Sequence, residues 1–457
     1  MLERFQTQLA ESGLIPENSR VLVGYSGGAD STCLLHLLHL SGVDVVAAHL
    51  HHGQREEADR ELKLCEAFAE SLGVPFASGR ANVPAISNEM GVGLEEAGRE
   101  ARYNFFRQAA YRLECDLIAT AHTRNDQIET VFLNITRGSG LAGLAGIPVR
   151  REQIVRPLLA FSREETRGYC EANGFWFHDD PANSDVSFSR ARVRHRVLPE
   201  LRLINPAVDE SIARLAHIAS EEDRFLNGMA AAALEQSEIP LNGDLRFLTL
   251  DAEVAFKLPV LAHLPPVLFR RALRLATESL GGGLTYDQTL SIEASVREGG
   301  RGSMTAEGGL VAAEWDIERL HVRLVQPTET FRFPLTMPGE TESEEFGWRF
   351  EAFVEPVSLV APVRASLSAE LASSGLKGSL YFRTAEPGDQ MMPLGFDHRR
   401  KLADILSEAK LTPAARRRLP IVCDLVGPVW APGVCLDERV RPGEGPVVKI
   451  SLIGLEG

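Results

Sequence analysis

The sequence predicts an α/β fold for its first 200 residues, with a doubly wound parallel sheet. A mainly helical or α+β region and a C-terminal β-rich region are predicted to follow. Three observations support this. Short apolar runs alternate with helical periodicity up to Pro199, as in β–α–β units. Long helical segments dominate next, and apolar and polar residues alternate after about residue 348.

The elements follow from these patterns in chain order. Buried strands are predicted where apolar residues run together, at 21–25, 44–49 and 116–120. Helices are predicted from the 3.6-residue spacing of apolar residues, at 1–19, 32–40, 56–72, 94–113, 124–135, 206–236 and 260–280. A small α+β unit is expected at 281–330, and a single C-terminal helix at 401–409.

The 457 residues are too many for one core, because domains usually hold roughly 100–200 residues. We expect three domains, at 1–205, 206–330 and 331–457. Prolines and glutamates gather at about 327–347, which predicts a linker or an exposed edge there.

Composition limits the class of protein. Hydrophobic residues make up 44% and charged residues 24% of the chain, which excludes a disordered or fibrous protein. The 48 basic and 63 acidic residues give a charge of −15, so nucleic acid could bind only where positive charge is concentrated. No apolar run reaches the roughly 18 residues of a membrane span, and no signal peptide is evident, so no membrane partner is expected. Six scattered cysteines without a C-x-x-C pair indicate free thiols and a cytoplasmic location.

The strongest local signal is a glycine-rich turn between the first predicted strand and its helix. It consists of Ser26, Gly27, Gly28, Ala29, Asp30 and Ser31. The glycines allow backbone amides to face one anion, and the helix adds its positive end. Asp30 could hold Mg²⁺ or cap the helix. No lysine follows, so this is not the Walker pattern. The alternative is an ordinary turn with a serine cap.

A second cluster begins the helix after the 116–120 strand. His122, Asp126 and Glu129 are spaced i, i+4 and i+7, so they share one helical face. Two carboxylates on one face can bind a metal ion or an ammonium group. A solvated acidic face, with His122 as a cap, is the alternative.

Arginines supply the local positive charge. They alternate at Arg190, Arg192, Arg194 and Arg196, which on a strand or an irregular segment would suit phosphate contacts. A solvated hinge is the alternative. A second island contains Arg399, Arg400, Lys401, Lys410, Arg416, Arg417 and Arg418, where a solvated face is the alternative. Arg102 could belong to a surface ion-pair ladder with its neighbours Glu95 and Arg99.

The turn resembles the PP-loop, S-G-G-x-D-S, of the N-type ATP pyrophosphatases, which cleave ATP between the α- and β-phosphates. Further segments resemble the tRNA(Ile)-lysidine synthetase family: residues 121–130, Arg137 to Pro148, the His49, His52 and Arg55 pattern, residues 95–103, and residues 187–196. A C-terminal pattern from Arg383 through Gly388-Asp389 to Gly395 is also similar to the family. Two departures stand out, since Asn125 replaces an aspartate and Ala191 an asparagine.

The resemblance implies ATP-dependent ligation of L-lysine to the wobble cytidine of the isoleucine tRNA with a CAU anticodon, through an adenylated cytidine. It implies ATP at residues 26–31 and Mg²⁺ at Asp30. Lysine would bind Asp126 and Glu129, which would also be catalytic because one of them could help deprotonate the nucleophile, and Arg102 and Arg194 would act with Asp30 in catalysis. Residues 1–205 would form the catalytic domain, 206–330 a tRNA substrate-binding domain and 331–457 a C-terminal tRNA-binding domain. Arg190, Arg192, Arg194, Arg399, Arg400 and Lys401 would bind the tRNA. The oligomeric state stays open, with a homodimer as one option.

Two other functions stay open. A PP-loop tRNA cytidine thiolase would transfer sulfur, but such enzymes commonly need C-x-x-C pairs. A non-catalytic, ATP-dependent RNA-binding module is the second, and the intact Asp30, Asp126 and Glu129 count against it.

Overall fold

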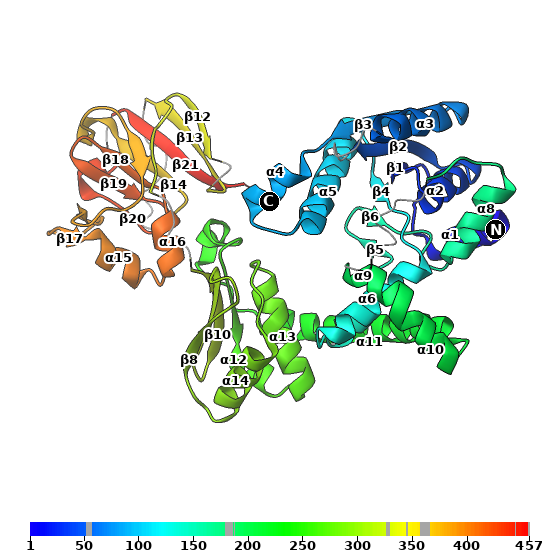
Figure 1. Ribbon diagram of the computed structural model, residues 1–457. Coiled ribbons are helices and arrows are strands. Elements are labelled where there is room, and N and C mark those ends of the chain that lie inside the picture. The colour runs from blue at the N-terminus through cyan, green and yellow to red at the C-terminus, as the bar shows by residue number, and fades with distance from the viewer. Residues whose placement is uncertain are drawn as a thin grey trace. The chain divides into compact units, whose positions relative to one another are not determined.

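The computed structural model describes residues 1–51, 57–178, 186, 188–325, 330–343, 346–356, 366–443 and 445–455 (Figure 1). The chain divides into two compact units, Met1–Phe225 and Leu226–Gly457, within helix α11 (Val208–Ser237). In the described part of the chain, no helix is both long and apolar enough to cross a membrane.

The first unit is built on a six-stranded sheet with the order β3-β2-β1-β4-β6-β5. The strands are β1 (Arg20–Gly24), β2 (Asp44–His51), β3 (Phe76–Arg80), β4 (Leu117–Ala119), β5 (Arg150–Arg151) and β6 (Ile154–Val155). All neighbouring strands are parallel except the β5–β6 hairpin. The chain winds from β1 towards β2 on one side and returns to β4 on the other. This order confirms the doubly wound sheet, whose switch point lies between β1 and β4.

Helices cover both faces of this sheet. Val21 and Val23 of β1 face a core shared with α1 (Leu2–Ser12), α2 (Ala29–Leu40), α3 (Glu57–Ser71) and α8 (Arg163–Ala172). Leu22 faces the opposite core, where α5 (Leu94–Arg112) packs. This alternation follows from the two-residue period of a strand. Both faces are buried, which explains the uninterrupted apolar runs in the sequence.

Most predicted elements of the first unit are confirmed to within a few residues, and two predictions are wrong. The helix predicted at 1–19 ends at Ser12, because Gly13 turns left-handed with φ 56°. The arginine-rich segment is neither a strand nor irregular. It is helical, through α9 (Ser189–Arg192), a π-helical turn at Val193–Val197 and α10 (Leu198–Ile204). Its apolar residues bury on α6 (Arg124–Thr136), which favours a helix over alternation.

The second unit begins with a four-stranded antiparallel sheet in the order β7-β10-β9-β8, with its own core. The strands are β7 (Glu253–Lys257), β8 (Gly302–Thr305), β9 (Val311–Trp315) and β10 (Arg319–Leu324). Helices α12 (Leu258–Ala262), α13 (Pro266–Glu278) and α14 (Tyr286–Arg297) accompany the sheet. Sheet and helices confirm the predicted α+β character.

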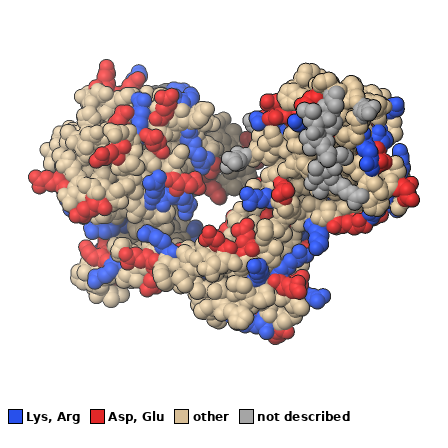
Figure 2. Space-filling view, turned by 180° about the vertical axis from the view of Figure 1, so that it is seen from behind, with Lys and Arg blue, Asp and Glu red and all other residues tan. Residues whose placement is uncertain are grey.

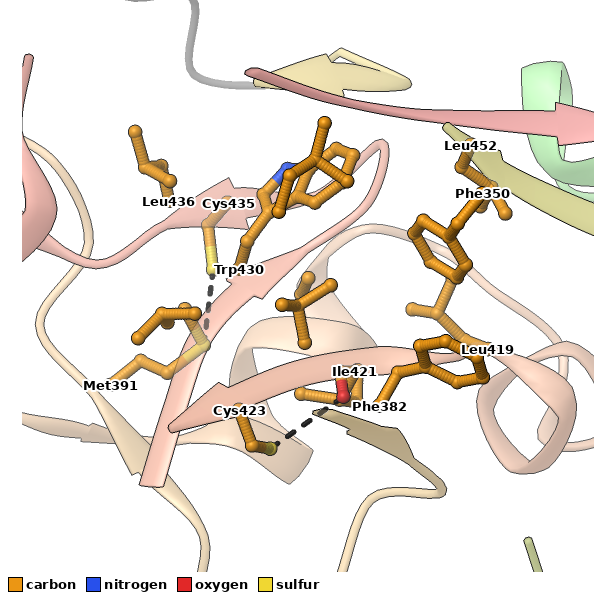
Figure 3. Packing of buried hydrophobic residues seen from close by; sticks show 14 of the residues in the cluster. Phe350, Phe382, Met391, Leu419, Ile421, Cys423, Trp430, Cys435, Leu436 and Leu452 are labelled. Carbon is orange, nitrogen blue, oxygen red and sulfur yellow. Dashed lines mark hydrogen bonds between the residues drawn. The ribbon is translucent and has the colours of Figure 1, made fainter. Parts of the chain in front are cut away.

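The C-terminal part is β-rich, as predicted. One antiparallel sheet contains β11 (Arg332–Pro334), β15 (Tyr381–Arg383), β18 (Ile421–Asp424), β19 (Gly427–Ala431) and β20 (Cys435–Leu436). The other contains β12 (Gly339–Ser343), β13 (Trp348–Glu355), β21 (Val447–Gly454) and β14 (Ser368–Ala372). Phe350 and Phe382 stack between them with ring centroids 4.9 Å apart (Figure 3). Burial of such large aromatic surfaces stabilises this core.

One detail of this part differs from expectation, and a second agrees with one of two alternatives. Besides α15 (Leu402–Glu408), close to the predicted helix at 401–409, a second helix α16 (Pro413–Arg418) follows a Thr412 cap. The segment 327–347, predicted as a linker or exposed edge, holds β11 and β12, which are edge strands of their sheets. Its residues 327–329, 344 and 345 lie outside the described part. The division into three domains stays a prediction.

Candidate active site

The predicted site lies where three parallel strands end. Residues 26–31 follow β1, His122 and α6 follow β4, and α8 follows β6 after a short connection. Two backbone hydrogen bonds tie the last two segments together, from Thr120 N to Val155 O at 3.0 Å and from Arg124 N to Phe161 O at 2.8 Å. Carboxyl ends beside a switch point are where open α/β sheets bind ligands.

The glycine-rich loop is held in one shape by its own side chains. The Ser26 and Ser31 hydroxyl oxygens lie 3.1 Å apart, and the Ser31 hydroxyl donates to Gly28 O at 3.0 Å. Gly27 has φ 82°, and a Cβ there would lie 2.8 Å from Cys65 Sγ and 3.2 Å from His178 Nδ1. The position therefore requires glycine. The first-turn amides of α2 have no acceptor within the helix and can bind an anion.

Asp126 and Glu129 of α6 cluster with Asp30 around one guanidinium, and these three carboxylates are called the acidic pocket. Asp126 Oδ2 accepts hydrogen bonds from Thr123 N and Oγ1, both at 2.9 Å, in a capping box. Glu129 is fully buried, and its two oxygens accept from Arg194 Nε at 2.7 Å and Nη2 at 3.0 Å. Such a bidentate pair is the strongest geometry for arginine and a carboxylate.

Arg163, the first residue of α8, was missed by sequence reasoning. Its Nε lies 3.5 Å from Asp30 Oδ2, its Nη2 donates to Asp126 Oδ1 at 3.0 Å and its Nη1 to Glu129 Oε1 at 3.4 Å. One guanidinium thus joins all three acidic residues singled out from the sequence. The Ser162 to Glu165 capping box was the available signal, since it marks a helix start at the end of the next strand.

The carboxylates of this pocket ionise differently. Burial raises the pKa of Asp30, and neither the Thr166 hydroxyl that donates to it nor Arg163 offsets that effect. Burial also acts on Asp126, but there the Arg163 charge, His122 and the Thr123 hydrogen bonds prevail and lower its pKa. Asp126 is therefore the more readily ionised anion of the two.

Asp30 also has the donor chemistry of a magnesium ligand. Mg²⁺ is usually bound by one or two carboxylates together with substrate phosphates. Asp30 lies in the first turn of α2, directly after the loop, and its side chain keeps 23% of its surface exposed. Among the residues that the structure describes, no three histidine, cysteine or acidic side chains are grouped as a cage for a metal.

His122 is a neutral group at the edge of the acidic pocket. Its Nδ1 lies 2.9 Å from Thr120 Oγ1, and burial lowers its pKa to about 4. The neighbouring Asn125, which stands where the resemblance expects an aspartate, does not reach the carboxylates. Its Oδ1 accepts from Arg163 N at 2.9 Å and so fixes the start of α8.

The remaining predicted residues are more dispersed. Arg190 Nη2 donates to Thr130 Oγ1 at 2.8 Å, and Arg192 is exposed. Arg102 is exposed on α5, and within the described ranges no hydrogen bond or ion pair joins it to the acidic pocket. In the second unit, Arg399 and Lys401 are exposed. His52 and Arg55 lie outside the described residues.

Arg400, by contrast, pairs with Glu408. Basic and acidic side chains are interspersed on the face shown in Figure 2. The tRNA-binding roles predicted from the sequence stay predictions.

Known proteins resemble the chain over almost all of its length. The model of the PP-loop domain matches residues 1–201, and that of the TilS substrate C-terminal domain matches 380–449. The chain is 32% identical to the tRNA(Ile)-lysidine synthase of Symbiobacterium thermophilum, over 97% of this chain and 96% of that protein. It is 31% identical to the tRNA(Ile)-lysidine synthase of Dehalococcoides mccartyi, over 97% of each. Among solved structures, the U34-tRNA thiolase NcsA of Methanococcus maripaludis covers 48% of this chain and 80% of its own, with 18% identity and a TM-score of 0.41.

Proposed function

Because the chain belongs to the tRNA(Ile)-lysidine synthase family, we propose that it ligates L-lysine to the wobble cytidine of the isoleucine tRNA with a CAU anticodon. One observation of the site carries this proposal. The carboxylates of Asp30, Asp126 and Glu129 meet around a single cation, next to a preorganised anion-binding loop. The pocket can thus hold cationic lysine beside the phosphates of ATP.

The reaction proceeds in two displacements. The oxygen at C2 of the cytosine attacks the α-phosphorus of ATP, and the bond to the β-phosphate breaks to release pyrophosphate. The ε-nitrogen of lysine then attacks C2, loses a proton and displaces AMP, which leaves with the former C2 oxygen. Adenylation is needed because that oxygen is otherwise a poor leaving group.

The residues of the chain take complementary roles in this proposal. The loop from Ser26 to Ser31 binds the pyrophosphate portion of ATP. Asp30 would hold Mg²⁺, which would supply positive charge beside the phosphates. Asp126 and Glu129 bind the ammonium groups of lysine. Arg194, already at the pocket, and Arg102 stabilise charge on the transferred phosphoryl group.

Exposed arginines of both units bind the tRNA backbone. The anticodon base is read in a splayed-out, single-stranded state. We infer a cytoplasmic location, where the substrate tRNA occurs, and a homodimer stays a prediction.

The test combines the protein, ATP, Mg²⁺, radiolabelled lysine and isoleucine tRNA with a CAU anticodon. We expect label to enter the tRNA, with AMP and pyrophosphate as the other products. The same tRNA carrying a CAC anticodon serves as the control. Folded protein that leaves the CAU tRNA unlabelled, or that labels both tRNAs equally, contradicts the proposal.

A further inference from the structure

Arg163 occupies the carboxylates to which lysine is assigned. Its three guanidinium nitrogens each face a different acid: Nε faces Asp30, Nη1 faces Glu129 and Nη2 faces Asp126. Arg194 also pairs with Glu129, whose side chain has no exposed surface. An incoming ammonium group cannot reach this carboxylate unless one of the two arginines moves.

Arg163 holds Glu129 less closely than Arg194 does. Arg194 makes a bidentate pair with Glu129 at 2.7 and 3.0 Å, whereas Arg163 divides its guanidinium among three carboxylates, 3.0 Å from Asp126, 3.4 Å from Glu129 and 3.5 Å from Asp30. The Arg163 side chain keeps 29% of its surface exposed and that of Arg194 22%. A long side chain with an open side can turn out of the pocket while its backbone stays fixed by Asn125.

The same guanidinium links two subsites. Asp30 belongs to the nucleotide side of the pocket, and Asp126 and Glu129 belong to the lysine side. ATP phosphates at the loop offer Arg163 a stronger, bidentate partner than a carboxylate 3.5 Å away. Movement of Arg163 towards these phosphates would free Asp126 Oδ1 and one acceptor position of Glu129 Oε1 for the lysine ammonium groups, while Arg194 keeps its pair with Glu129.

We propose that Arg163 is a positioning residue that makes lysine binding depend on nucleotide binding. This inference rests on the proposed function. In the free protein the arginine competes with lysine for Asp126 and Glu129, and bound nucleotide withdraws it. The device disfavours the binding of lysine before ATP. Because coupling between two sites is reciprocal, lysine must tighten nucleotide binding by the same factor.

The test measures the dissociation constant of L-lysine by calorimetry, without and with Mg²⁺ and α,β-methylene-ATP, which cannot be cleaved at the reacting bond. For the unmodified protein we expect the analogue to lower this constant about tenfold, a common size for coupled sites. In Arg163→Gln, lysine should bind tightly even without the analogue. The ratio of the lysine dissociation constants without and with the analogue should therefore fall close to one. Arg167→Gln is the matched control, because Arg167 lies on the same helix and pairs with Glu171.

Three results overturn the inference. The first is that the analogue does not lower the lysine dissociation constant of the unmodified protein, and the second is that Arg163→Gln keeps the full decrease. The third is that Arg163→Gln binds lysine more weakly than the unmodified protein both without and with the analogue. The last would mean that Arg163 only holds the carboxylates in place. If Arg163→Gln does not fold, Arg163→Lys replaces it. Because a single ammonium group cannot span three carboxylates, Arg163→Lys should show a smaller ratio of lysine dissociation constants than the unmodified protein. An unchanged ratio contradicts the inference. Failure of the unmodified protein to label tRNA would instead refute the proposed function.

Discussion

Glu129→Gln is the substitution that tests the acidic pocket most directly. It keeps the shape of the side chain but removes the charge that Arg194 and Arg163 share. Removing one partner of a buried ion pair costs roughly 3–5 kcal/mol. Arg194 and Arg163 keep 22% and 29% of their side-chain surface exposed, so water compensates part of that loss. We therefore expect the free energy of unfolding of the first unit to fall by about 2 kcal/mol.

Thermal unfolding checks this value. For domains of this size, 1 kcal/mol shifts the midpoint by roughly 2–4 °C, so a decrease of about 4–8 °C is expected. Glu171→Gln is the matched control. Glu171 is 59% exposed and pairs with Arg167 at i, i+4, an interaction worth only about 0.3–0.5 kcal/mol. Equal midpoints for the two variants would refute the buried charge network.

Lysine use gives the second readout of Glu129→Gln. Loss of a charge-assisted hydrogen bond costs about 1.5–3 kcal/mol, which corresponds to a roughly 10–100-fold higher KM for lysine. The KM for ATP should change much less, because Glu129 lies on the lysine side of the pocket. Equal effects on both substrates would show that Glu129 serves the nucleotide instead.

Three further substitutions or titrations test other parts of the structure. Gly27→Ala puts a residue with a side chain into a left-handed backbone conformation and should destabilise the first unit by about 1–2 kcal/mol in a thermal scan. Gly28→Ala is the control, because Gly28 has an ordinary φ of −76°, and it should cost less than half of that. Burial lowers the pKa of His122 to about 4, so its NMR signals should show no inflection near the ordinary pH of about 6.5. Because the unfolded chain takes up this proton first, stability falls as the pH drops from about 6.5 towards 4. Asp389→Asn breaks the buried bidentate pair of Asp389 with Arg383, and we expect the free energy of unfolding of the second unit to fall by about 3 kcal/mol. Glu386→Gln is the control, since substituting the exposed Glu386 should cost about 0.5 kcal/mol or less.

The parts of the site that follow continuous apolar runs could be predicted from the sequence, because such runs mark buried strands. β1 and β4 are buried on both faces, so they appear as continuous apolar segments, and the residues that follow them had to lie at one edge of the sheet. That reasoning placed the glycine-rich loop and the acidic pair beside each other. The capping box of α6 then directs Asp126 inwards, as its spacing from His122 suggested.

Arg163 was not predicted as a site residue, because the strand before it leaves almost no recognisable pattern in the sequence. β6 contains only Ile154 and Val155, too short for any periodicity. An arginine at the start of an amphipathic helix is normally exposed, and its three partners lie 34, 37 and 133 residues away in sequence. Contacts of that separation are set by the sheet order, which one sequence does not reveal.

The arginine-rich segment shows a different limit. Alternating charges at 190–196 suggested a strand or an irregular segment, but charge does not set secondary structure when apolar residues follow another pattern. Ala191, Val193 and Leu198 are buried, and the last two pack in a core with α6. In the helical form, Arg190 and Arg194 are four residues apart and both reach α6, at Thr130 and Glu129. Arg192 stays exposed and available to an anion.

The basic residues of the C-terminal island also fall into two groups, those that stabilise the fold and those that are exposed for binding. Arg400 pairs with Glu408, Arg416 donates to Ser407, and Arg418 pairs with Asp251. These three arginines therefore hold helices and neighbouring strands together. The exposed cations of the island are Arg399, Lys401, Lys410 and Arg417. Since phosphate binding needs cations without a fixed internal partner, these four, and not the whole island, should carry the salt dependence of tRNA binding in a chain of net charge −15.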